Sequence, residues 1–222
     1  ELDLRHSVET ESGGKKVTQW RGLPDRLCFV SPDLLCVSTG LHLRLIDIKK
    51  RKSPKIVDTL RLSKNAFRGV SSIRSAGKSE VWAACRRGGL IKVKVGRRKM
   101  SIASQTPVNG WATDVLLNGQ HAFIATGKGL EVFDVSGPDP KKLAELDTLR
   151  HCEYLALSGS TLFFTSKYYL VAIDISEVTK PKVLSEIGTI DPFFYSGAVS
   201  LLAIGDYIYC SHTEGGVYVW QF

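Results

Sequence analysis

The stretch that decides the fold is GLEVFDVS at residues 129–136, because versions of it recur along the chain. The other versions are LRLIDI at 43–48, LIKVKV at 90–95, LVAIDI at 170–175 and VYVW at 217–220. Equivalent positions fall at 47, 94, 134, 174 and 220, so successive copies are 47, 40, 40 and 46 residues apart. A period of about 43 residues is typical of the blades of a β-propeller.

Each repeat unit reads as four short strands separated by turns. In the third unit, apolar runs at 114–117 and 121–126 flank Asn118-Gly119, which is the chemistry of a two-residue hairpin turn. A glycine-containing turn then leads to the recurring phrase, and a loop with prolines at 136–140 leads to a fourth strand. No segment has helical periodicity, so the sequence predicts an all-β fold.

We predict one five-bladed β-propeller, an ordinary size for a single all-β domain. Its blades are expected at about 20–62, 67–105, 110–148, 151–188 and 195–222. The last unit lacks a fourth strand, and residues 1–10 precede the first unit. Pairing these two ends removes an unpaired sheet edge, so we expect residues 1–10 to close the last blade.

The repeats resemble the LVIVD repeat family, a group of β-propeller proteins within the broad WD40-like class. The resemblance lies in LRLID, LEVFD and LVAID, ending at 47, 134 and 174, and in the segments DVSGPDP and DISEVTKP that follow the last two. Lys94 and Trp220 stand where the family has Asp in the second and fifth units. The resemblance implies a propeller and, mostly, surface or scaffolding proteins. It implies no particular chemistry.

The charge of the chain is unevenly distributed. Residues 1–100 hold 23 Lys and Arg against 9 Asp and Glu, whereas residues 101–222 hold 7 against 13. A basic half indicates an acidic partner, such as an acidic peptide, nucleic acid or an anionic membrane surface, or else a solvated face without a partner. Nucleic acid is the weaker of these, because no strand combines aromatic and basic residues in a recognition motif. No apolar run is long enough for a membrane span.

The five cysteines favour packing over metal binding. There is no CxxC motif and no histidine at ligand spacing, so we expect no metal and no cofactor. Cys36, Cys85 and Cys210 recur at one repeat position and are expected to be buried small residues. Cys28 faces Cys36 across a turn, but a disulfide there is the less favoured alternative. The odd cysteine count and the absence of a glycosylation sequon favour a reducing intracellular compartment, with the cell surface as the alternative that the resemblance implies.

An enzyme is the less favoured interpretation. A glycosidase-like site needs two or more carboxylates close together. The positions expected at the central mouth of the propeller are Asp25, Arg68, Asp114, Glu153 and Ser196. Arg68 interrupts the series of carboxylates that such a site needs. The neighbouring His151, Cys152 and Glu153 alternate between faces of a strand, which disfavours a shared site. We therefore expect no catalytic residues. A carbohydrate or other small-molecule site at the central mouth remains the alternative.

The candidate binding residues lie on the turns that a propeller gathers at one end of the ring. These are the connections between units and the turns between second and third strands. Arginine and aromatic side chains often anchor protein interfaces. We therefore predict a non-enzymatic protein-binding or scaffold domain that presents a basic, aromatic-bearing face to an acidic partner. The predicted binding residues are Arg68, Arg86, Arg87, Trp111, Lys128, His151, Lys167 and Tyr195.

Overall fold

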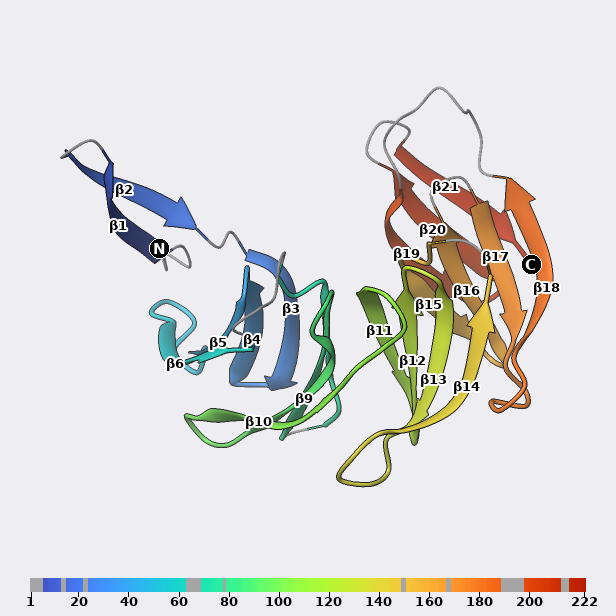
Figure 1. Cartoon of the computed structure of the whole chain (residues 1–222), viewed down its shortest axis with the longest axis horizontal. Coiled ribbons are helices and arrows are strands. Elements are labelled where there is room, and N and C mark those ends of the chain that lie inside the picture. Colours follow the sequence, from blue (N-terminus) through green and yellow to red (C-terminus); the bar gives the residue numbers. More distant parts are fainter. Residues whose placement is uncertain are drawn as a thin grey trace. The chain divides into compact units, whose positions relative to one another are not determined.

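The computed structural model shows an all-β chain (Figure 1). It describes residues 6–12, 15–21, 24–62, 69–77, 79–148, 151–166, 169–188, 198–212 and 216–222. The described residues contain strands and turns and no helix, and so no helix that is long and apolar enough to cross a membrane. The chain forms two compact units, an N-terminal unit (Glu1–Gln105) and a C-terminal unit (Thr106–Phe222), which we describe separately.

The N-terminal unit holds a hairpin and two four-stranded antiparallel sheets. The hairpin pairs β1 (His6–Ser12) with β2 (Lys15–Arg21). The first sheet consists of β3 (Pro24–Ser31), β4 (Leu34–Thr39), β5 (His42–Asp47) and β6 (Lys55–Arg61). The second sheet consists of β7 (Ser72–Ser75), β8 (Glu80–Cys85), β9 (Gly89–Val95) and β10 (Met100–Thr106).

The C-terminal unit holds three further sheets, whose strands follow one another in chain order. The third sheet consists of β11 (Ala112–Asn118), β12 (His121–Thr126), β13 (Gly129–Asp134) and β14 (Lys141–Asp147). The fourth sheet consists of β15 (Leu155–Ser158), β16 (Thr161–Ser166), β17 (Tyr169–Asp174) and β18 (Lys182–Gly188). The fifth sheet has three described strands, β19 (Ala198–Ile204), β20 (Tyr207–His212) and β21 (Gly216–Gln221).

Glycine sets the geometry of the turns inside each unit. Gly119 has φ 57° in the tight turn that joins β11 to β12, a left-handed conformation that glycine adopts without a steric penalty. Gly129 opens β13 with φ 144°, and a Cβ atom there would collide with the carbonyl oxygen of Leu146 on β14. At this φ, only glycine at position 129 fits beside the Leu146 carbonyl without a clash.

The sheets within each unit stack face to face and bury the recurring apolar phrase. In the N-terminal unit, Leu43 and Leu45 of the first sheet pack in one core with Ile91 and Val93 of the second. The Met100 N–H also donates a hydrogen bond of 2.6 Å to the Asp58 carboxylate, which joins these two sheets at β10 and β6. The first strands of neighbouring sheets, β3 and β7, are in contact.

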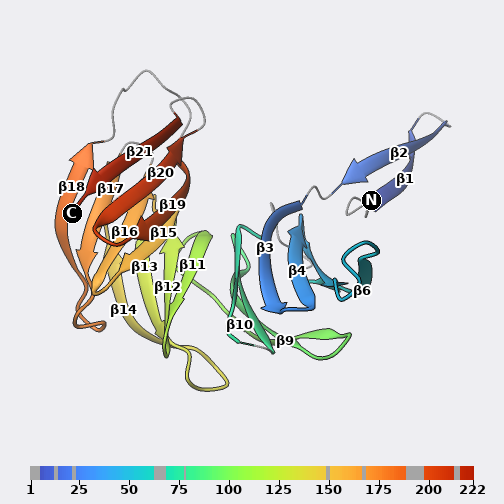
Figure 2. The same ribbon diagram turned by 180° about the vertical axis from the view of Figure 1, so that it is seen from behind.

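The same stacking continues through the C-terminal unit. Phe123 and Leu130 of the third sheet share a core with Phe164 and Ile173 of the fourth. The opposite face of the fourth sheet packs against Ile208 of the fifth. Figure 2 shows the strands of the fifth sheet beside those of the fourth. The first strands β11, β15 and β19 contact one another in that order. Stacked four-stranded sheets whose first strands lie side by side are what a propeller requires of consecutive blades.

The N-terminal strand has a local partner in the structure, and its expected pairing with the last strand stays a prediction. We expected residues 1–10 to pair with the last strand, but β1 pairs with β2, and β21 has β20 as its neighbour in the fifth sheet. Among the described residues, the fifth sheet has three strands where each of the other four propeller-like sheets has four.

The fifth sheet leaves one apolar face exposed, and the first sheet exposes two apolar side chains on β3, although Val37 and Ile46 on the same face of the first sheet are buried. Leu27 and Phe29 on β3 are 61% and 60% exposed, and they alternate with Cys28 and Val30, which pack toward the second sheet. On the fifth sheet, Leu202 pairs with Tyr209 and then with Val219 on the face that turns away from the fourth sheet. The exposed apolar residues of this face are Leu202, Ile204, Tyr207, Val217 and Val219.

Candidate functional site

Three of the predicted binding residues gather at one end of the third sheet. The Gly127 N–H donates a hydrogen bond of 3.0 Å to the Trp111 carbonyl. A Cβ atom at Gly127 would lie 3.5 Å from the His151 ring, and one at Gly110 would lie 3.7 Å from the Lys128 side chain. The Trp111 backbone, the Lys128 side chain and the His151 ring therefore lie close to the backbone of Gly110 and Gly127, and we call Trp111, Lys128 and His151 the Gly127 cluster.

Hydrogen bonds from neighbouring threonines hold the Gly127 cluster in place. The Thr126 hydroxyl donates to the Gly129 carbonyl at 3.1 Å and accepts the Lys128 N–H at 3.2 Å, which fixes the turn between β12 and β13. The Cys152 N–H donates to the Thr126 carbonyl at 3.0 Å. The Thr113 hydroxyl lies 2.6 Å from the Cys152 carbonyl, so the connection that carries His151 is tied to the third sheet from two sides.

The cluster is exposed and of mixed charge. Trp111 is 42% exposed, an unusual extent for so large an apolar side chain, and Lys128 is also exposed. His151 Nδ1 lies 3.4 Å from the Glu153 carboxylate. Hydrogen bonds from Lys142 and Asn109 lower the pKa of Glu145, and the charge of Lys128 contributes to this. Lys128 and His151 thus lie near the carboxylates of Glu145 and Glu153, respectively.

Arg86 and Arg87 occupy the turn between β8 and β9 in the N-terminal unit. The turn is closed by the Gly88 N–H, which donates to the Cys85 carbonyl. The Gln105 side-chain amide donates to the Gly88 carbonyl at 2.8 Å and holds the turn against β10. Arg86 is half-buried and Arg87 is exposed. This turn and the Gly127 cluster belong to different units, so they are two separate groups of predicted site residues.

The other predicted binding residues, Arg68, Lys167 and Tyr195, lie outside the described residues. Two of the residues expected at the central mouth, Arg68 and Ser196, lie outside them as well.

Asp114, a carboxylate expected at the central mouth, binds the backbone in the structure. It is only 3% exposed. One carboxylate oxygen accepts the N–H of Leu155 at 2.9 Å and the other accepts the N–H of Val115 at 2.9 Å. The Leu155 bond joins the third sheet to the fourth. Among the other expected carboxylates, Glu153 pairs with His151, and Asp25 lies 3.4 Å from Arg26.

Cys152 has the surroundings of an unreactive thiol. It is fully buried, and its burial raises its pKa well above the ordinary value, with the nearby charges of Asp114 and Glu153 adding to the shift. A raised pKa leaves little thiolate, which is the nucleophilic form of cysteine. The described part of the chain also has no group of three or more His, Cys, Asp or Glu residues arranged to hold a metal ion.

A buried charge network next to the cluster was missed by sequence reasoning. Glu131 lies in the middle of the recurring phrase and is 1% exposed. Its carboxylate lies 3.2 Å from the Lys142 ammonium, which in turn donates to Glu145 at 2.6 Å. Burial alone would lower the pKa of Lys142, but hydrogen bonds with Glu145 and Glu131 outweigh it and raise this pKa. The only sequence signal was a glutamate inside an apolar strand.

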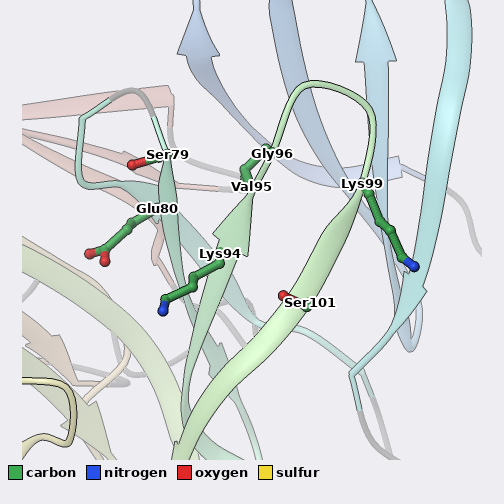
Figure 3. Close-up of a pocket in the computed structure, with 7 residues that line it drawn as sticks. All are labelled: Ser79, Glu80, Lys94, Val95, Gly96, Lys99 and Ser101. Atoms are coloured by element: carbon green, nitrogen blue, oxygen red, sulfur yellow. The ribbon is translucent and has the colours of Figure 1, made fainter.

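A cavity of about 610 Å³ lies on the second sheet, at the end opposite the Arg86–Arg87 turn. Its lining residues are Ser79, Glu80, Lys94, Val95, Gly96, Lys99 and Ser101. Figure 3 shows the Glu80 and Lys94 side chains on the same side of the sheet and the Lys99 side chain directed away from them. The Glu80 carboxylate also lies 3.2 Å from the Lys92 ammonium, so it is already paired.

The comparisons with known proteins point to a β-propeller-like repeat protein. An LVIVD repeat is recognised at residues 109–144, which confirms the resemblance for the third unit. No curated protein matches the chain.

Solved structures resemble the fold of much of this chain at low sequence identity. A protein from Lactobacillus plantarum superposes with a TM-score of 0.75 at 13% identity, covering 98% of this chain and 76% of its own. The computationally designed Ika8 protein gives 0.60 at 12% identity, covering 90% and 71%. The designed Ika4 protein gives 0.53 at 12% identity, covering 69% and 91%. At these identities the likeness concerns the fold alone.

Proposed function

We propose that the five sheets close into a five-bladed β-propeller and that residues 1–10 add the missing strand of the last blade. The exposed apolar faces support this proposal. The first and fifth sheets expose apolar side chains, namely Leu27 and Phe29 on β3 and Leu202 and Val219 on one face of the fifth sheet. Closing the ring buries both faces against each other. Strand β1 keeps one edge free in the two-stranded hairpin, so it is able to pair with β21 without losing β2.

We further propose that this propeller is a non-enzymatic protein-binding or scaffold domain that takes an acidic partner. The observation that carries the proposal is the Gly127 cluster, in which the exposed Trp111 belongs to the same group of connections as Lys128 and His151. A tryptophan that keeps much of its surface in water, on a face that also carries a lysine, has the composition of an interface anchor. The rigid turn and connection that hold the cluster reduce the entropy lost on binding.

The charge of the N-terminal unit supports an acidic partner. Residues 1–105 hold 23 Lys and Arg against 9 Asp and Glu, so this unit has a strong positive charge. A closed propeller gathers the turns between second and third strands at one end of the ring. Under this proposal, Arg86 and Arg87 share a face with Lys128, and a partner with acidic groups and one apolar anchor fits that face.

The test is a binding assay with matched charge reversals. Acidic peptides that carry one aromatic residue are titrated by fluorescence anisotropy against the whole chain at low and at physiological salt. The test variants are Trp111→Ala and the pair Arg86→Glu with Arg87→Glu. The control pair is Arg97→Glu with Arg98→Glu, which makes the same charge change in the turn between β9 and β10, at the other end of the second sheet.

We expect each test variant to bind at least about tenfold more weakly, a loss of about 1.4 kcal/mol, and the control pair to bind like the parent chain. Binding should also weaken as salt rises, because exposed charges are screened beyond about 8 Å at physiological ionic strength. Equal losses in the test and control pairs would show that only net charge matters. Unchanged binding in folded test variants would overturn the assignment of the site.

A further inference from the structure

Two cysteines in the first sheet lie directly opposite each other. Cys28 of β3 is the register partner of Cys36 of β4. Directly opposed residues of antiparallel strands have Cα atoms about 4.5 or 5.5 Å apart, depending on whether the pair is hydrogen-bonded. Both separations fall within the range of about 4.4–6.8 Å that a disulfide spans. The backbone is thus already set for a bond between these two residues.

The two side chains point to the same face and differ in access to solvent. Both belong to the core between the first and second sheets, where Cys36 is fully buried and Cys28 is only partly buried. A hydrogen bond with the Cys36 thiol lowers the pKa of Cys28, against the effect of burial, and the charge of Arg74 contributes. The same hydrogen bond and burial raise the pKa of Cys36.

This asymmetry gives the two thiols separate roles. The thiolate is the reactive form of cysteine, and it is favoured at the more accessible residue, Cys28. The protonated, buried Cys36 is in position to resolve an oxidised Cys28, which is the arrangement of a redox-sensitive cysteine beside a resolving one.

We propose that Cys28 and Cys36 form an oxidation site, at which a peroxide converts the two thiols into a disulfide within the β3–β4 hairpin. The Cys28 thiolate attacks one peroxide oxygen, the S–O bond forms and the O–O bond breaks, leaving a sulfenic acid and, after protonation, water. The Cys36 sulfur then attacks the Cys28 sulfur, the S–S bond forms, the S–O bond breaks and a second water leaves. Two thiols and one hydrogen peroxide thus yield one disulfide and two waters.

The remaining cysteines serve as internal controls. Burial raises the pKa of Cys85 to about 12 and that of Cys210 to about 11, and it raises that of Cys152 as well. None of these three is a register partner of another cysteine in the described strands. They should stay reduced under conditions that oxidise the pair.

The experiment treats the reduced whole chain with hydrogen peroxide, then unfolds it and alkylates the free thiols with N-ethylmaleimide. Trypsin releases both cysteines of the pair in one peptide, residues 27–44, because the next basic residue after Arg26 is Arg44. We expect this peptide to lose about 2 Da and to take up no reagent, because its two thiols are joined in a disulfide. Peptides with Cys85, Cys152 and Cys210 should be alkylated as before.

Single variants test the order of the two steps. Cys36→Ser should stop the reaction at the Cys28 sulfenic acid, which dimedone labels, and Cys28→Ser should leave Cys36 reduced. Cys85→Ser should form the disulfide at the parent rate. The proposal is overturned if peptide 27–44 keeps two alkylatable thiols while the other cysteines oxidise at the same peroxide dose. It is also overturned if Cys28→Ser leaves Cys36 as readily oxidised as in the parent chain.

Discussion

The carboxylate of Asp114 should contribute to stability and not to chemistry. It is nearly fully buried, and its two oxygens accept the N–H groups of Leu155 and Val115, each at 2.9 Å. Removing it in Asp114→Ala leaves two backbone donors without this acceptor and breaks a link between the third and fourth sheets. A hydrogen bond to a charged group contributes about 1.5–3 kcal/mol, and a buried donor left unsatisfied costs about 1–3 kcal/mol.

We therefore expect Asp114→Ala to lower the free energy of unfolding by about 3 kcal/mol, allowing for relaxation of the adjacent Val115 bond. In a chain of this size that corresponds to a fall in the unfolding midpoint of about 6–12 °C. Asp114→Asn keeps one oxygen acceptor and should show an intermediate loss. Calorimetry and urea unfolding followed by tryptophan fluorescence measure both variants.

The matched control is Asp139→Ala, which removes an exposed aspartate from the β13–β14 loop of the same sheet. Exposed substitutions of this kind usually change stability by no more than about 0.5 kcal/mol. If Asp114→Ala is as stable as this control, the two backbone hydrogen bonds do not hold the sheets together. The carboxylate would then be available for the acid role that a carbohydrate-cleaving site at the central mouth requires.

Two further predictions concern the third sheet. Gly129→Ala should cost about 2 kcal/mol or more in urea unfolding, because φ is 144° and the new Cβ meets the Leu146 carbonyl. Gly119→Ala, where φ is 57° and nothing lies within 4 Å, should cost only about 1 kcal/mol, and equal losses would contradict the proposed clash. The pKa of Glu145 is lowered from 4.5, so its contribution to stability is present above that pH and is lost as the pH falls through its lower folded-state value. Glu145→Gln should therefore lower the unfolding midpoint at pH 7 more than at pH 3, and the reverse order would refute the role of this carboxylate.

The repeat phrase predicted most of the fold, because its spacing and its turn residues are local signals. Asn118-Gly119 and the apolar runs around it are sufficient to place the strands of the third sheet. The pairing of Cys28 with Cys36 also followed from a short turn and was confirmed. The hairpin β1–β2 was not predicted, although Gly13-Gly14 is a two-residue hairpin signal in the sequence, because closure of the last blade was given more weight.

The candidate site was predictable only where the repeat brings equivalent turns together. Trp111, Lys128 and His151 meet because they lie on connections at the same end of the third sheet. The pairing of Glu131 with Lys142 was not predictable, because the register shifts at a bulge between Val132 and Phe133 and sequence spacing alone does not reveal this shift. The backbone role of Asp114 depends on contact with a residue 41 positions away, which is also invisible to local patterns.

Closure of the five sheets into one ring is the claim on which the proposed binding face depends. Hydrogen exchange at the amides of β21 tests it directly, since about half of them point away from β20 toward the open edge of the fifth sheet. If residues 1–10 close the last blade, these amides should exchange at least about tenfold more slowly than unprotected amides, equivalent to about 1.4 kcal/mol. Deleting residues 1–10 should remove that protection while leaving the third and fourth sheets protected. Exchange of the outward β21 amides at the unprotected rate in the whole chain would contradict the closed ring.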